Sequence, residues 1–501
     1  MAETSSAPAR ALGFWTCTAL VVGNTIGVGI FLTPAALAPF GLNAVPAWLI
    51  TIVGCVLLAM VFSGLAQQYP ADDGPYNYTQ RAFGSGTSFY VLWCYWVSTW
   101  VTNATIATGV VGYLTILVPA LRKPPWLPPV TALSMLWLFV LVNSLGIRTA
   151  AWMQMVTTVL KLLPQVGIII LGGWLLVAHP SLYVAHIPPN PASLRDILAG
   201  STIALYSMLG IECAMMPAGK VIDPARTIPR ATIVGTLATA LIYLCVSVVP
   251  MLLIPQAELS ASNAPFSDLF GNYMGAQYGR WVAFFVVVSG LGALNGWTLI
   301  VGDLTQTFAR HGNFPQVLGK VNSRAAPVYA FVLTGIAASL TLVLNYNPSM
   351  AKVFTFLINL VAAANLPLYL ACSLAVLTLW RRGEIDRVGR RQLVWFGAAL
   401  FAAIYCVWSF VGVGREPLLW AVALAAMGIP ARRSVPGATP VQHALLAVFP
   451  FACFRAEGVD DALVDGISLT VNAVGVDLEQ DRDAVPGASR DLGGGYPGVQ
   501  P

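Results

Sequence analysis

The chain has 501 residues, of which 57% are hydrophobic and only 9% are charged. Soluble domains carry about 25% charged residues, so this composition excludes a soluble enzyme or binding domain and predicts an integral membrane protein. The net charge of +5 does not indicate a nucleic-acid partner, because the basic residues are dispersed between apolar segments.

Charge-poor apolar segments recur along the whole chain. They lie at roughly 11–37, 45–66, 86–118, 128–146, 150–178, 197–218, 231–254, 279–309, 326–345, 353–380, 392–413 and 417–430. Because about 20 apolar residues cross a bilayer as a helix, the sequence predicts an all-α membrane protein with about twelve transmembrane helices, the last one short. We expect a cytoplasmic N-terminus at 1–10 and a disordered tail at 431–501, which has acidic residues but no periodicity.

Basic residues predict the orientation of these helices, since cytoplasmic loops are enriched in Lys and Arg. Sixteen of them flank the segments on one face, and the opposite face holds only Arg122, Lys123, Arg195, Arg280, Lys352 and Arg415. We therefore expect a multi-pass protein of the cell (inner) membrane with both termini in the cytoplasm.

The sequence gives no indication of catalysis or of a cofactor. Seven of the eight cysteines lie in apolar segments without metal-ligand spacing, and the four histidines, His179, His186, His311 and His443, lie in loops or in the tail. A Gly-rich phosphate loop is also missing from the sequence, so ATP does not drive the protein. We expect no enzyme activity, no metal and no cofactor.

The first apolar segment contains Gly23-Asn-Thr-Ile-Gly-Val-Gly-Ile-Phe31. Each glycine costs a helix about 1 kcal/mol relative to alanine, so the segment should open near Gly27 and Gly29. Unwound backbone at membrane depth survives where protein or a water-filled cavity satisfies it, and interrupted helices form the solute sites of secondary transporters. Alternatively, Gly23 and Gly27 only allow two helices to pack closely.

The sixth segment carries a similar feature, Tyr206-Ser-Met-Leu-Gly-Ile-Glu212, in which a glycine lies close to a carboxylate in mid-span. The second interruption comes five segments after the first, as expected for inverted repeats of five helices that meet at a binding site. The position of these segments predicts repeats at about 11–178 and 197–380, followed by two peripheral helices at about 392–430.

Two ionisable residues lie deep inside apolar segments, where charge costs about 2.5–3.5 kcal/mol. Burial favours the neutral amine of Lys161, which would let it exchange a coupling proton; its fixed charge could also replace a sodium ion. The alternative is that Lys161 only braces loose carbonyls of the first helix. Glu212 is either a protonatable gate or a structural hydrogen-bond acceptor.

Several motifs, taken together, resemble the amino acid–polyamine–organocation transporters. They are Gly23 to Phe31, Gly74-Pro-Tyr-Asn-Tyr78 with Phe83-Gly84, Gly210-Ile-Glu212, Gly296-Trp297-Thr298, Asp223-Pro-Ala-Arg226, Ala264-Pro-Phe266 and Gly312-Asn-Phe-Pro315. The nearest branch is that of the basic amino acid/polyamine antiporters, of the arginine/agmatine type. The resemblance covers about residues 12 to 430 and implies a leucine-transporter-like core of five plus five helices with helices 1 and 6 discontinuous.

The resemblance also implies a site for a small amino acid or amine. Its backbone groups would come from Thr25, Ile26, Gly27, Val28 and Gly29, with Tyr206 as the gating aromatic and Leu209 at the next carbonyl. Trp297 would stack on the substrate, and the stripe Tyr95, Thr99 and Asn103 would line its side chain, although such a stripe is also typical of ordinary polar helix contacts.

Departures from the arginine/agmatine pattern leave a second function open. Val28 and Leu360 stand where the exchanger has serines, Tyr206 replaces a tryptophan, and Lys161 replaces an alanine. The alternative is a proton-coupled amino acid symporter that uses Lys161 and has broader or neutral specificity. A channel would need a continuous polar pore, which these apolar spans do not favour. Whether the chain forms a homodimer in the bilayer is left open.

Overall fold

The computed structural model describes residues 13–69, 74–145, 160–179, 192–212, 221–324, 326–344, 349–385 and 390–429. All of them belong to one compact unit, Met1–Ala438. The N-terminal segment 1–10 and the tail 431–501 lie outside the described residues, so the expectations for them stay predictions.

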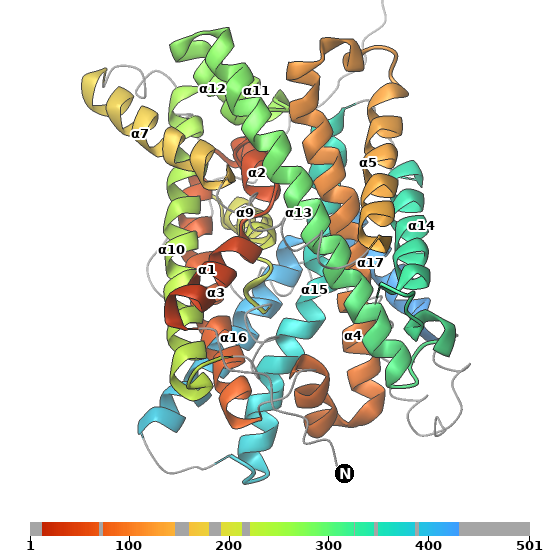
Figure 1. The fold of residues 1–501 in the computed structure, drawn as a ribbon. Coiled ribbons are helices and arrows are strands. Elements are labelled where there is room, and N and C mark those ends of the chain that lie inside the picture. Colours follow the sequence, from red (N-terminus) through yellow and green to blue (C-terminus); the bar gives the residue numbers. More distant parts are fainter. Residues whose placement is uncertain are drawn as a thin grey trace, which may run out of the picture. The chain divides into compact units, whose positions relative to one another are not determined.

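The described chain is all-helical (Figure 1). Its first half forms α1 (Phe14–Thr25), α2 (Gly29–Leu37), η1 (Ala38–Asn43), α3 (Ala44–Gln68), α4 (Gly74–Leu117), η2 (Pro119–Arg122), α5 (Leu127–Ser144), α7 (Leu162–Ala178) and α9 (Leu194–Ser207). Its second half forms α10 (Pro224–Leu253), α11 (Gln256–Ala261), α12 (Pro265–Met274), α13 (Ala276–Arg310), η5 (Gln316–Gly319), α14 (Val328–Leu344), α15 (Met350–Arg381), α16 (Arg390–Gly412) and α17 (Arg415–Ala426).

Each apolar segment expected from the sequence contains an α-helix, and the first segment contains two, α1 and α2. Within the described ranges, 7 helical stretches are long and apolar enough to cross a membrane. Phe14–Gly23, Leu162–Ala178 and Val328–Leu344 are shorter apolar helices. The prediction of an all-α membrane protein is therefore confirmed.

Helix α4 lies at the centre of the bundle and packs along α13 and α15. Its backbone turns at Gly84, which adopts φ 86° and ψ 171°, a conformation that only glycine reaches without steric cost. The short helix before Gly84 therefore changes direction, and the long apolar part that follows runs through the core as the sequence predicted from residue 86 onward.

Helix α2 is held in place at the end of the bundle where α4 finishes. The hydroxyl of Tyr113 donates to the Phe31 carbonyl at 2.7 Å and accepts the amide of Phe266, at the start of α12, at 3.2 Å. The side-chain amide of Gln256, on α11, donates to the Ala38 carbonyl at 2.8 Å. One tyrosine and one glutamine therefore tie α2 to the short helices α11 and α12.

The other end of the bundle is closed by polar contacts. Arg81 pairs with Glu384 at 2.6 Å, and its guanidinium lies 4.5 Å from the ring centroid of Tyr69. Arg382 donates to the Arg81 carbonyl at 3.1 Å. These contacts join the end of α3 and the first part of α4 to the turn that follows α15.

Candidate functional site

The first apolar segment is interrupted close to where the glycines predicted an opening. Helix α1 ends at Thr25, Ile26 adopts an extended conformation (φ −73°, ψ 97°), and α2 begins at Gly29. Helix ends leave carbonyls at the C-terminus and amides at the N-terminus without partners inside the helix. The interruption therefore presents carbonyls of α1 and amides of α2 in the middle of the bundle.

Buried side chains already bind the carbonyls at the end of α1. The Lys161 amine donates to the carbonyls of Gly23 at 2.6 Å and Ile26 at 2.8 Å, and the Tyr243 hydroxyl donates to the Thr25 carbonyl at 3.0 Å. Lys161 is only 1% exposed. This geometry is the bracing role that the sequence offered for Lys161, and it places the amine directly at the interruption.

In the sixth segment the helix ends shortly before the predicted glycine, and residues 213–218 of this segment lie outside the described residues. Helix α9 ends at Ser207, and Gly210 has φ 107°, which favours glycine. The Glu212 carboxylate follows at once and accepts hydrogen bonds from the hydroxyls of Tyr369 at 2.6 Å and Tyr95 at 3.2 Å and from the Gly210 amide at 3.1 Å. Glu212 therefore fastens the broken end of α9 to both α4 and α15.

The start of α2 and the end of α9 contact each other. The hydroxyls of Thr33 on α2 and Ser207 on α9 lie 2.7 Å apart. A Cβ at Gly29 would lie 2.6 Å from Cε1 of Tyr206, closer than real Cβ atoms approach, so the ring needs glycine at this position. The start of α2 and the end of α9 thus form one wall of a site.

A cavity of about 20 Å³ lies between these two helix ends. Its lining consists of Thr25, Gly27, Val28, Gly29, Thr102, Ile106, Tyr206, Ser207, Leu209 and Trp297. We call this cavity the central chamber. A volume of about 15 Å³ already accommodates one water molecule, so in this conformation the chamber is contracted and too small for an amino acid.

Seven of the predicted site residues line the central chamber, whereas Ile26, Tyr95, Thr99, Asn103, Lys161 and Glu212 do not. Ile26 is buried with its carbonyl on Lys161, and Tyr95 is bonded to Glu212. The Thr99 hydroxyl donates to the Trp96 carbonyl at 2.7 Å. Asn103 is 4% exposed, and its Oδ1 has no hydrogen-bond partner within the described part of the chain.

The sequence missed Thr102, Ile106 and Ser207. Thr102 and Ile106 are four residues apart and so share a face of α4. That face is rotated relative to the predicted stripe, and Ile106 carries no polar signal that would have singled it out. Ser207 is next to Tyr206 and would have been found from the end of α9.

Val28 is fixed by close packing rather than by polar contacts. A Cβ at Gly109 on α4 would lie 2.4 Å from Val28 Cγ1, and one at Gly290 on α13 would lie 2.5 Å from Val28 Cγ2. The valine side chain therefore occupies the space that these two glycines leave open. Val28 can therefore form hydrogen bonds only through its backbone.

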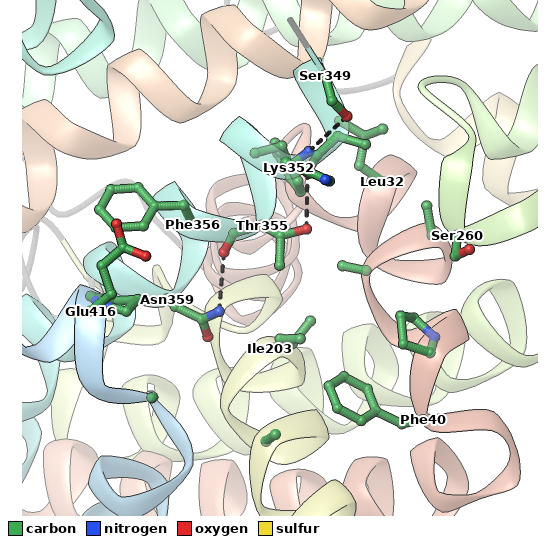
Figure 2. Close-up of a pocket in the computed structure, with 18 of the residues that line it drawn as sticks. Leu32, Phe40, Ile203, Ser260, Ser349, Lys352, Thr355, Phe356, Asn359 and Glu416 are labelled. Carbon is green, nitrogen blue, oxygen red and sulfur yellow. Dashed lines mark hydrogen bonds between the residues drawn. The ribbon is translucent and has the colours of Figure 1, made fainter. Parts of the chain in front are cut away.

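A second and larger cavity, of about 710 Å³, lies beside α2, α9, α15 and the start of α17 (Figure 2). We call it the vestibule. Phe354 lines the vestibule and contacts Tyr206 edge to face, with ring centroids 6.2 Å apart. Since Tyr206 lines the central chamber, this ring pair separates the two cavities.

The polar groups of the central chamber are of three kinds. No group of three or more His, Cys, Asp or Glu side chains that could hold a metal occurs in the residues that the structure describes. What the chamber offers is backbone amides at the start of a helix, which favour anions, hydroxyl groups, and the Trp297 ring, whose face attracts cations.

Comparison with known proteins identifies the family. A family model described as "Amino acid permease" matches residues 12–435. The chain belongs to the amino acid permease family. This assignment agrees with the motif combination in the sequence and makes the protein a membrane transporter rather than an enzyme.

Curated relatives place this permease in the branch of basic amino acid and polyamine antiporters. The putrescine transporter PotE of Escherichia coli (strain K12) is 29% identical over 426 residues, which cover 85% of this chain and 96% of that protein. The PotE of Haemophilus influenzae is 28% identical over 425 residues, covering 84% and 96%. The cadaverine/lysine antiporter of Escherichia coli (strain K12) is 32% identical over 347 residues, covering 67% and 75%.

Proposed function

We propose that the protein exchanges a cationic amino acid for an amine across the cell membrane by alternating access. The observation that carries this proposal is the contracted central chamber between the break in the first helix and the end of α9, separated by one aromatic pair from an open vestibule. Alternating access needs such a site with a thin barrier on the open side and a thick one on the other. Putrescine, cadaverine and lysine appear in the names of similar proteins and fit this substrate class.

In this proposal the substrate carboxylate binds the amides at the start of α2. A helix N-terminus carries open N–H donors and about half a positive charge, and Gly29 lets the substrate approach the backbone closely. Trp297 faces a positively charged side chain, a contact worth about 2 kcal/mol when desolvated. The carbonyls of Gly23, Thr25 and Ile26 already accept hydrogen bonds from Lys161 and Tyr243, and a carbonyl oxygen can accept a second hydrogen bond from the substrate ammonium.

The fold and orientation belong to the same proposal. The two interruptions occupy equivalent places in predicted repeats of five helices, about 11–178 and 197–380, which supports an inverted-repeat core within about twelve spans. The excess of basic residues on one face supports cytoplasmic termini. With this orientation the vestibule opens to the outside, and the Arg81–Glu384 end faces the cytoplasm.

Counterflow in proteoliposomes tests the proposal. Vesicles loaded with unlabelled cadaverine or lysine should take up external labelled lysine, and empty vesicles should not. Uptake by empty vesicles under a pH gradient would instead support the alternative, proton-coupled symport. If labelled lysine enters neither kind of vesicle, exchange of cationic amino acids is wrong.

The alternative is favoured by one observation, the position of Lys161. Its buried amine touches two carbonyls at the interruption of the first helix, so loss of its proton would weaken the brace that holds α1. A proton taken up or released there would be coupled to the shape of the site. The pH dependence of uptake by the Lys161→Gln protein distinguishes this role from a purely structural one.

A further inference from the structure

The vestibule has two walls of different chemistry. On α15 the lining residues Lys352, Thr355, Phe356 and Asn359 are three and four residues apart and share one face. The facing wall is mostly apolar, with Leu32, Ala35 and Ala36 of α2, Phe40 of η1 and Ile203 of α9, and the lining also includes Ser260 and Ser262. Figure 2 shows the polar stripe of α15 across the cavity from Leu32, Phe40 and Ile203.

Two charged side chains lie on the polar side. Among the residues that line the vestibule, Lys352 is the only base and Glu416, in the first turn of α17, is the only acid. The side-chain Nδ2 of Asn359 donates to the Thr355 carbonyl at 3.1 Å. The side-chain Oδ1 of Asn359 is buried and has no hydrogen-bond partner in the described chain. A cleft with low-dielectric walls focuses the field of such charges and raises the local concentration of complementary ligands.

We propose that the vestibule is a second ligand site, which takes an α-amino acid on its way to the central chamber and selects it through Lys352. The ligand carboxylate pairs with the Lys352 amine, its ammonium lies toward Glu416 and Asn359, and its aliphatic side chain packs on Leu32 and Ile203. This inference rests on the proposed exchange function and adds a specificity-determining residue outside the chamber.

Lys352 distinguishes the two partners of an exchange because they differ by one group. An amine made by decarboxylation keeps the amino groups of the amino acid and loses its carboxylate. Lys352 therefore attracts the carboxylate of the incoming amino acid and repels the departing amine, which has only cationic groups, while Glu416 attracts the ammonium groups of both. The vestibule would in this way favour amino acid entry and amine release from the same side.

The kinetic test uses L-lysine and cadaverine, which differ only by the carboxylate. In vesicles loaded with cadaverine, Lys352→Gln should raise the KM for external lysine on the order of threefold to tenfold, with little change in the maximal rate, and leave the KM for external cadaverine equal or lower. Glu416→Gln should raise both KM values.

Lys123→Gln is the control, because it removes an exposed lysine that does not line the vestibule, and it should change neither KM value. Equal KM values for Lys352→Gln and wild type, or equal shifts for both ligands, would overturn the proposal.

A labelling test measures the reactivity of a cysteine in the vestibule and does not require transport. It therefore tests this inference separately from the proposed function. Thr355→Cys should react faster with an anionic than with a cationic methanethiosulfonate reagent, and external lysine should slow the reaction more than cadaverine does. Adding Lys352→Gln should abolish both differences. If wild type fails to exchange lysine but these differences are found, only the exchange function falls. Absence of labelling, or labelling that ignores reagent charge and ligand, refutes the vestibule site.

Discussion

The phenol ring of Tyr206 covers Gly29 so closely that a Cβ at position 29 would lie 2.6 Å from Tyr206 Cε1. The same ring contacts Phe354, and the two aromatic side chains lie between the vestibule and the central chamber. In the proposed function, a solute that moves from the vestibule to the central chamber displaces the Tyr206 ring. The fit between this ring and the first residue of α2 therefore couples the gate to the amides proposed to bind the carboxylate.

Gly29→Ala should disturb both gate and site. Overpacking of this kind costs about 1–3 kcal/mol, and every 1.4 kcal/mol is tenfold in affinity, so lysine binding should weaken about tenfold or more. Gly173→Ala is a suitable control, because a Cβ there meets no atom within 4 Å. Scintillation proximity binding with purified protein measures both, and wild-type affinity in Gly29→Ala would show that Tyr206 moves freely.

Lys161→Gln should destabilise the protein more than Tyr243→Phe does. The lysine is bonded to two carbonyls at the interruption and the tyrosine to one, and hydrogen bonds to charged groups contribute about 1.5–3 kcal/mol against about 1 kcal/mol for neutral ones. Thermal unfolding in detergent gives the order of the two variants. Equal stability of both variants and wild type would argue against the brace.

The hydroxyl groups on Glu212 should differ in importance. Tyr369 donates at 2.6 Å and Tyr95 at 3.2 Å, and short bonds to a carboxylate are the stronger ones. Tyr369→Phe should therefore reduce stability and exchange rate more than Tyr95→Phe, by about 1–2 kcal/mol in unfolding free energy. The reverse order would mean that Glu212 is held mainly through α4.

Trp297→Ala, on α13, should weaken lysine binding by about 2 kcal/mol, the value of a desolvated cation–π contact.

Two variants on α4 distinguish the stripe that was predicted from the sequence from the residues that line the chamber in the structure. Thr102→Val should also weaken binding, because Thr102 lines the chamber. If Asn103→Ala is the more damaging of the two α4 variants, the chamber expands toward the predicted stripe when substrate binds, and Thr102 is not the main contact.

The interruption of the first helix was predictable, because three glycines in seven residues weaken a helix whatever surrounds it. That Lys161 binds carbonyls at this break was one of the hypotheses drawn from the sequence, because a buried amine needs hydrogen-bond acceptors. Tyr243 and Tyr369 were not predicted. A tyrosine in an apolar segment gives no signal until the helix it faces is known.

The stripe on α4 shows the other limit of sequence reasoning. Spacing by four correctly placed Tyr95, Thr99 and Asn103 on one face, but spacing does not fix how the helix is rotated about its axis. Packing against α13 and α15 sets that rotation and turns Thr102 and Ile106 to the chamber.

The most direct test of the central claim is an electron cryo-microscopy structure of the protein with bound lysine. We predict density for the ligand between the end of α1 and the start of α2, its carboxylate on the first amides of α2, its side chain beside Trp297 and the Tyr206 ring moved from its present position. A continuous first helix, or lysine bound elsewhere with the central chamber still contracted, would contradict the account.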